Sequence, residues 1–139
     1  MTYAFRLSIF LACAAAWGRP VHAQEAIDVA HQLLAAFNAH DPTAMAELVT
    51  DDFELFYLDQ EGRAGLAITG PEALRTEMAA YFEALPDVRS EVAGAIPGTR
   101  YVAFRERIVG GQSSLAVYEI EGAFVRRAWY YPAESGPGG

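Results

Sequence analysis

The sequence predicts an α+β protein in which helices cover one face of a curved antiparallel sheet. Hydrophobic residues recur at helical spacing in the first part of the chain, up to Leu85. From Val88 onward they alternate with polar residues, which is the period of strands, and glycine-containing pairs that favour turns separate the alternating runs. Helices followed by a meander of strands predict a single domain with one core.

Three helices are expected before the meander. Residues 25–39 carry hydrophobic side chains at the spacing of one buried helix face. A second helix over 42–49 begins with Asp41 as its cap, because a carboxylate accepts hydrogen bonds from free N–H groups and Pro42 needs no such partner. A third opens at Gly70 and Pro71 and ends before Pro86. Its apolar stripe consists of Leu74, Met78, Tyr81, Phe82 and Leu85.

Five strands are expected, the first separated from the others by the third helix. Residues 59–64 form a polar turn after the first strand, and three dipeptides at 97–98, 110–111 and 121–122 provide turns between the later strands. The expected strands span residues 53–58, 88–93, 101–109, 113–120 and 124–131.

The first 23 residues predict a cleaved signal peptide. Arg6 precedes an apolar run over residues 7–17, which is too short to span a bilayer, and Ala23 supplies the small residue at the cleavage point. We therefore expect the protein to be exported to the periplasm or secreted, with Gln24 as the mature N-terminus and no membrane association. Residues 24–133 would form the domain, and 134–139 a disordered tail.

Composition excludes several classes of function. The single cysteine, Cys13, lies within the predicted signal peptide, so the mature domain would have no disulfide and no thiolate nucleophile. Acidic residues number 18 against 10 basic ones, a balance that repels nucleic acid, and none of the basic residues is a lysine. Schiff-base chemistry is therefore excluded. We expect no cofactor and no bound metal, since His31 and His40 are not spaced as ligands on one helix.

Three short segments resemble landmarks of a known family. They are Phe-Asn-Ala-His-Asp at 37–41, Asp-Asp-Phe at 51–53 and Gly-Pro-Glu-Ala-Leu at 70–74, and the last strand, with Trp129 near its end, is similar too. Over residues 25–131 the chain resembles SnoaL-like domains of the nuclear transport factor 2-like superfamily, which includes ketosteroid isomerases. The resemblance implies a cone-shaped half-barrel with a pocket between the helices and the concave face of the sheet. Members isomerise, cyclise, dehydrate, hydrolyse or only bind, so the fold does not select a function.

The polar groups of ketosteroid isomerases are not matched in this chain. The resemblance places their general-base aspartate at Tyr57, their tyrosine donor near Leu33 and their second acid near Ser114. We therefore do not predict that reaction.

Glu106 is the candidate catalytic residue. It shares one face of its strand with Val102, Phe104 and Ile108, all apolar, so strand parity directs its carboxylate towards the core. Desolvation would raise its pKa and suit it to general acid or base catalysis. The alternatives are that it pairs with an arginine or that a bulge turns it outward.

Aromatic residues are the candidates for ligand contact, because large rings with polar tips both bury and orient a flat apolar ligand. The alternative is that they only fill the core. The candidates are Tyr57, Tyr81, Tyr118, Trp129 and Tyr131.

Three functions remain open. The first is an exported binder of a small apolar or aromatic molecule, and the second is an acid–base enzyme of isomerase, cyclase or hydratase type using Glu106 with a tyrosine. The third is a protein-interaction module, and a homodimer through the outer sheet face is compatible with all three. The expected outer-face residues are Arg105, Arg107, Leu115, Val117, Phe124, Arg126 and Tyr130.

Overall fold

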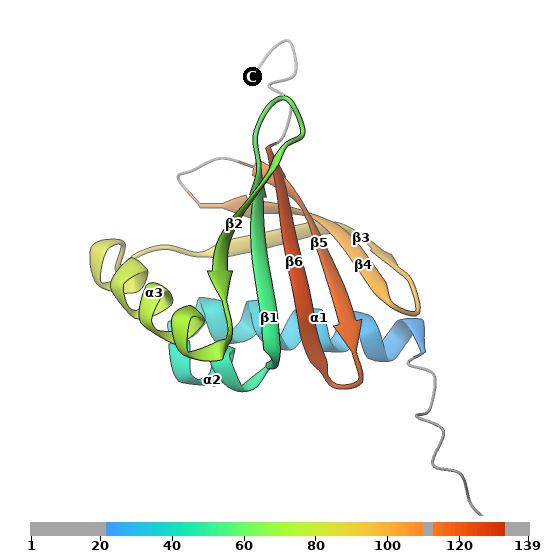
Figure 1. The fold of residues 1–139 in the computed structure, drawn as a ribbon, viewed down its shortest axis with the longest axis horizontal. Coiled ribbons are helices and arrows are strands. Elements are labelled where there is room, and N and C mark those ends of the chain that lie inside the picture. Colours follow the sequence, from blue (N-terminus) through green and yellow to red (C-terminus); the bar gives the residue numbers. More distant parts are fainter. Residues whose placement is uncertain (1–21, 110–112, 133–139) are drawn as a thin grey trace, which may run out of the picture.

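A computed structural model describes residues 22–109 and 113–132, and Figure 1 shows an open sheet with helices against one face. Three predicted segments fall outside the described residues. They are the tail, the glycine pair at 110–111, and the predicted signal peptide except for its last two residues. None of the described helices is long and apolar enough to cross a membrane. The α+β class predicted from the sequence is confirmed.

The three predicted helices are present. Helix α1 (Ala23–Asn38) runs behind the sheet in Figure 1 and buries one stripe of apolar residues, Leu33 and Leu34 among them. Helix α2 (Pro42–Glu47) begins where Asp41 Oδ1 accepts a hydrogen bond from Ala44 N at 2.9 Å. Helix α3 (Pro71–Ala84) ends ahead of Pro86.

The sheet has six strands in the order β2-β1-β6-β5-β4-β3. Strand β1 runs parallel to β6, while the other four neighbouring pairs are antiparallel, so the sheet is mixed and stays open at β2 and β3. The strands are β1 (Val49–Leu58), β2 (Ala64–Thr69), β3 (Ser90–Pro97), β4 (Tyr101–Ile108), β5 (Ser113–Glu121) and β6 (Phe124–Pro132).

Strand β2 was not expected from the sequence. Only Ile68 of its six residues is buried, so the alternation that identifies a half-buried strand is missing there. The chain instead forms a hairpin with β1, in which Ile68 lies opposite Leu55.

A β-bulge in β6 reverses the expected alternation of its side chains. Ile120 of β5 lies opposite Val125, but the preceding Glu119 lies opposite Arg127, so Arg126 is an extra residue in β6. After the bulge, Ala128 and every second residue beyond it face the helices. We call the helix-covered side the concave face and the open side the convex face.

The core lies between α1, α3 and the concave face. Its largest fully buried hydrophobic side chains are Tyr118, Phe53, Phe104 and Leu74. Burying a side chain of this size contributes about 1.5–3 kcal/mol.

Candidate functional site

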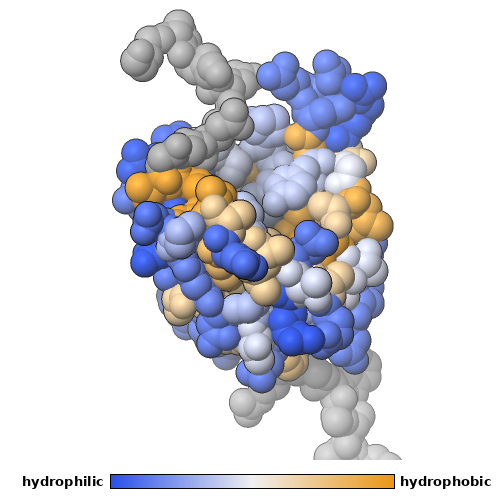
Figure 2. Space-filling view, turned by 90° about the vertical axis from the view of Figure 1, so that its left-hand side faces the viewer, coloured by the Kyte–Doolittle hydropathy of each residue, from blue (hydrophilic) through white to orange (hydrophobic). Residues whose placement is uncertain are grey.

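A cavity of about 750 Å³ opens between the C-terminal end of α3 and the ends of the sheet strands. Its walls come from α3, from the loop at residues 85–88, and from β1, β4, β5 and β6. Figure 2 shows this side of the molecule, with hydrophobic side chains around a hollow near the top of the view. A smaller cavity of about 60 Å³ continues inward, and Tyr57, Met78, Glu106 and Tyr130 line both.

Glu106 is the buried acid of this cavity. It lies on the concave face of β4 and is only 4% exposed. Its Oε1 accepts a hydrogen bond from Ser90 Oγ at 2.5 Å, whereas its Oε2 is buried without a partner among the described residues. Desolvation raises the pKa of the Glu106 carboxyl, and the Ser90 hydrogen bond opposes that rise in part.

Asn38 fixes the serine that contacts Glu106. Its side-chain amide donates to Ser90 O at 2.9 Å and accepts from Ser90 N at 2.7 Å. Because Asn38 ends α1 and Ser90 begins β3, this pair of bonds ties the helix to the edge strand. The Ser90 hydroxyl is thereby held against the carboxylate.

The buried Tyr118 and the partly buried Tyr130 form a hydrogen-bonded pair beside the carboxylate. The hydroxyl oxygens of Tyr118 and Tyr130 lie 2.8 Å apart, and their rings meet edge to face. Burial raises the pKa of both phenols well above its usual value, so both stay protonated at physiological pH. Each can therefore donate one hydrogen bond.

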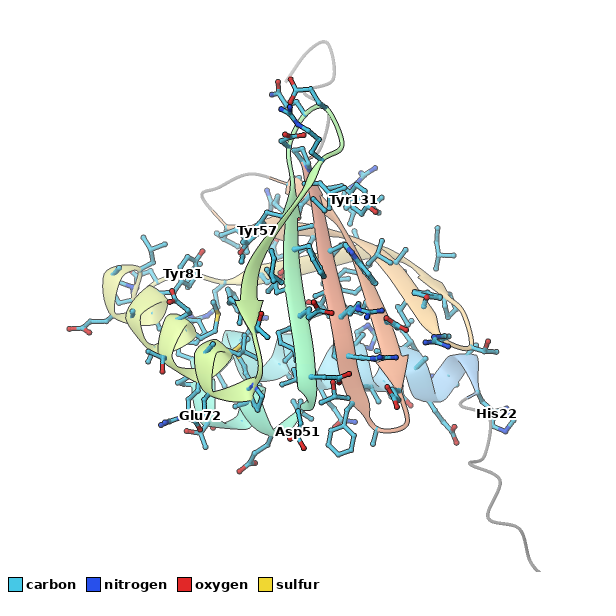
Figure 3. The ribbon with its side chains drawn as sticks, viewed as in Figure 1. His22, Asp51, Tyr57, Glu72, Tyr81 and Tyr131 are labelled. Carbon is cyan, nitrogen blue, oxygen red and sulfur yellow. The ribbon has the colours of Figure 1, made fainter. Side chains whose placement is uncertain are left out.

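Tyr57 and Tyr81 form the outer part of the cavity wall. Tyr57 projects from β1 and its ring centre is 5.6 Å from that of Tyr130, while Tyr81 projects from α3. Figure 3 labels both, on the two sides of the opening between helix and sheet. Tyr57 is 55% exposed, so the phenol is accessible from solvent as well as from the cavity.

Two predicted contact residues are placed differently. Trp129 was expected to line the pocket, but the bulge puts it on the convex face, where it stacks on Phe56 with ring centres 6.0 Å apart. Tyr131 has the same outward parity, but it lies near the end of β6 and lines the larger cavity, not the smaller one. Tyr130, expected on the outer face, faces inward instead. Counting strict alternation from the buried Val125 places Tyr130 on the outer face, so the sequence pattern could not identify Tyr130 as a cavity residue.

No basic side chain lines either cavity among the described residues, and the acidic side chains are Glu106 and Asp87. His40 lies outside the lining of both cavities: its Nε2 is 2.8 Å from Val88 O and its ring stacks on Phe82. Within residues 22–109 and 113–132 no cluster of acidic, histidine or cysteine side chains could hold a metal ion. The titratable groups that line the inner cavity are the Glu106 carboxyl and the phenols of Tyr57, Tyr118 and Tyr130.

A family profile described as a SnoaL-like domain matches residues 30–128 of the chain. This segment contains Glu106, Ser90, Asn38 and the three tyrosines at 57, 81 and 118. Tyr130 lies just beyond it. None of the curated proteins matches the chain.

Several solved structures share the fold. A SnoaL-like protein of unknown function from Burkholderia thailandensis has a TM-score of 0.69 and 24% identity, covering 82% of this chain and 98% of that one. An uncharacterized cystatin-fold protein from Novosphingobium aromaticivorans has a TM-score of 0.65 and 26% identity, covering 75% and 95%. A protein from Kribbella flavida, named as a candidate ketosteroid isomerase, has a TM-score of 0.62 and 18% identity, covering 84% of each chain.

Proposed function

The chain belongs to the SnoaL-like domain family, and from this premise we propose that it binds a small apolar or aromatic molecule in the cavity beneath α3. The observation that carries the proposal is Glu106, which lines a 750 Å³ cavity and whose buried Oε2 has no hydrogen-bond partner among the described residues. Small-molecule sites have about this volume, with mostly apolar walls and a few polar groups that orient the ligand.

The unpartnered oxygen supports occupancy by a ligand. A buried acceptor without a hydrogen bond costs about 1–3 kcal/mol, and more when it is charged. A ligand donor would recover that free energy. Most of the other lining residues are hydrophobic or aromatic, such as Met78, Ile108 and Tyr57, and they favour an apolar ligand body.

A blocking substitution tests the proposal. The neutral dye N-phenylnaphthylamine becomes fluorescent in apolar sites, and its fluorescence should rise on titration with the protein. Ala84→Trp, at the cavity mouth on α3, should abolish the rise, whereas Ala79→Trp, on an exposed part of the same helix that does not line the cavity, should leave it unchanged. Equal fluorescence with both variants would place the dye elsewhere and reject the proposal.

A second candidate function is acid–base catalysis at the same site. Glu106 would accept a proton through Oε2, and Tyr130 or Tyr57 would donate a hydrogen bond to the developing oxyanion. The raised pKa of the carboxyl favours it, as does the fold shared with the candidate ketosteroid isomerase. Deuterium exchange next to the carbonyl of a bound ketone, followed by NMR in D₂O and lost in Glu106→Gln, would support this function. A bound ketone that shows no exchange above buffer would oppose it.

The convex face supports a homodimer. One row of six paired residues crosses the entire sheet and is apolar throughout, and we call it the apolar row. Its two ends are exposed, 55% at Leu66 and 69% at Ile96. A continuous apolar strip on an open sheet is typical of an interface, and a two-fold axis would let it pair with itself. The row consists of Leu66, Phe56, Trp129, Val117, Ala103 and Ile96.

Export of the protein is part of the proposal. Its support is the charged start, the short apolar run and the small residue at position 23. Sequencing the N-terminus of protein from its native host should give Gln24, and an intact Met1 on protein from the cytoplasm would reject export.

A further inference from the structure

We propose, on the basis of the cavity acting as a binding site, that its ligand is an organic amine whose protonated nitrogen contacts Glu106 Oε2 among the tyrosine rings. The inference names the ligand class, which the proposed function leaves open. Three independent features of the cavity carry it: the geometry of the carboxylate, the charge of the walls and the arrangement of the rings.

The carboxylate is held with one oxygen free. Ser90 Oγ occupies Oε1, and Ser90 is fixed in turn by Asn38, while Oε2 has no partner among the described residues. A donor that enters from the cavity, such as a ligand N–H group, would satisfy this acceptor. A charged N–H donor forms a hydrogen bond to a carboxylate about twice as strong as a neutral donor forms to a neutral acceptor.

The charge of the walls selects against anions. The described lining includes two acidic side chains, Glu106 and Asp87, and no arginine or histidine. The chain has no lysine at all. An anionic ligand would therefore meet like charge with no compensating cation, whereas an ammonium group would neutralise the buried carboxylate.

The rings beside Glu106 suit a cation. Tyr57 and Tyr130 pack with ring centres 5.6 Å apart, and Tyr118 meets Tyr130 edge to face at 6.3 Å. The face of an aromatic ring attracts an ammonium group, and the attraction reaches about 2 kcal/mol when the site is desolvated. Burial raises the pKa of four phenols, and the charge of the nearby Glu106 raises it further in each: Tyr57, Tyr81, Tyr118 and Tyr130.

Three probes of matched shape test the inference. Naphthylethylamine, naphthylethanol and naphthylacetate share one aromatic body and differ in the charge of the side group. In calorimetric titrations near neutral pH, the amine should bind at least about tenfold more tightly than the alcohol, a difference of about 1.4 kcal/mol. The carboxylate should bind more weakly than either.

Substitutions identify the group responsible. Glu106→Gln keeps the shape but removes the charge, so it should reduce amine affinity to that of the alcohol while alcohol affinity changes little. Glu91→Gln, an exposed control on the neighbouring strand, should keep the amine preference. Tyr57 is half-exposed, so Tyr57→Leu should not impair folding. This substitution should reduce the affinity for the amine more than the affinity for the alcohol.

The outcomes separate this inference from the proposed function. If the alcohol binds as tightly as the amine, or if Glu106→Gln retains the amine preference, the amine inference is wrong and the cavity remains a binding site. If none of the three probes binds, the cavity is not a binding site and both proposals fall.

Discussion

The Ser90 hydroxyl donates a hydrogen bond to Oε1 of Glu106, and the two oxygens are 2.5 Å apart. This bond explains how a carboxyl group is accommodated on the concave face of β4 without an arginine beside it. Ser90 is itself fixed by the side chain of Asn38 at the end of α1. A chain of contacts thus runs from the helix through β3 to the acid, and it leaves the second carboxyl oxygen without a hydrogen-bond partner among the described residues.

Ser90→Ala should destabilise the protein by about 1–3 kcal/mol, because it leaves Oε1 of Glu106 buried without a donor. Chemical denaturation followed by circular dichroism measures the change. Ser114→Ala is a matched control: Ser114 lies opposite Glu106 on β5 but makes no hydrogen bond to it. The control should change the free energy of unfolding by less than about 0.5 kcal/mol. Equal effects of the two substitutions would contradict the role of the Ser90 hydroxyl.

Asn38→Ala should also cost about 1–3 kcal/mol, since it removes two hydrogen bonds to the Ser90 backbone. Asn38→Asp should not rescue the loss, because an aspartate cannot donate to Ser90 O. Gln32→Ala, on the exposed side of α1, provides the control and should be close to neutral. If Asn38→Asp is as stable as the native protein near neutral pH, the hydrogen bond that the Asn38 amide donates to Ser90 O does not contribute to stability.

The pH dependence of stability should report on Glu106. Burial raises the pKa of this carboxyl above its ordinary value of 4.5, so the folded protein holds the proton more tightly than the unfolded chain does. The contribution of Glu106 to stability is therefore present in full below the ordinary pKa and is lost as pH rises through the raised one.

Glu106→Gln does not titrate, so the variant should gain stability relative to the native protein as pH rises. The gain should be about 1.4 kcal/mol for each pH unit between the two pKa values and then level off. Denaturation curves of the native protein and the variant at a series of pH values give this difference, and a flat difference for Glu106→Gln would mean that the carboxyl is not desolvated.

The sequence predicts the acid of this site but only some of the aromatic residues. Val102, Phe104 and Ile108 alternate without interruption around Glu106, and strand parity holds along the whole of β4. Parity fails in β6, because Arg126 is an extra residue there and each side chain after it lies on the opposite face from the one that alternation predicts. Both sides of β6 carry aromatic residues there, so hydrophobicity alone cannot reveal the exchange.

Strand β2 and the contact of Asn38 with Ser90 could not be predicted from the sequence, for a different reason. Strand β2 has a single buried residue, Ile68, so its pairing with β1 leaves no hydrophobic period. Asn38 and Ser90 are 52 residues apart and both are polar. Their contact depends on how α1 packs against β3, which local patterns do not encode.

The tyrosine pair should be energetically coupled. Tyr130→Phe removes one hydroxyl and leaves that of Tyr118, which is 1% exposed, without its partner at 2.8 Å. A double-mutant cycle with Tyr118→Phe should show non-additivity of about 0.5–3 kcal/mol in the free energy of unfolding, because the second substitution removes a group that is already unpaired. Tyr101→Phe, on the exposed convex face, should be additive with either. Strict additivity of the Tyr118 and Tyr130 substitutions would show that the hydroxyl pair adds nothing to stability.

Trp129→Lys should convert the proposed homodimer into a folded monomer. Trp129 occupies the middle of the apolar row, between Phe56 of β1 and Val117 of β5, so a charge there would be buried without a partner in the interface. Within the monomer the lysine would lie on the open convex face, where its ammonium group can extend into water. Folding should therefore be retained, as circular dichroism would verify.

Light scattering at micromolar concentrations should give twice the chain mass for the native protein and the single chain mass for Trp129→Lys. Leu85→Lys places the same charge on an exposed hydrophobic residue at the cavity rim, outside the row, and should remain dimeric. Leu66→Lys, at the exposed end of the row, should weaken the dimer less than Trp129→Lys, because end positions of an interface stay partly hydrated. A native protein that is monomeric across this range, or a Trp129→Lys variant that is still dimeric, would remove the convex face from consideration as the interface.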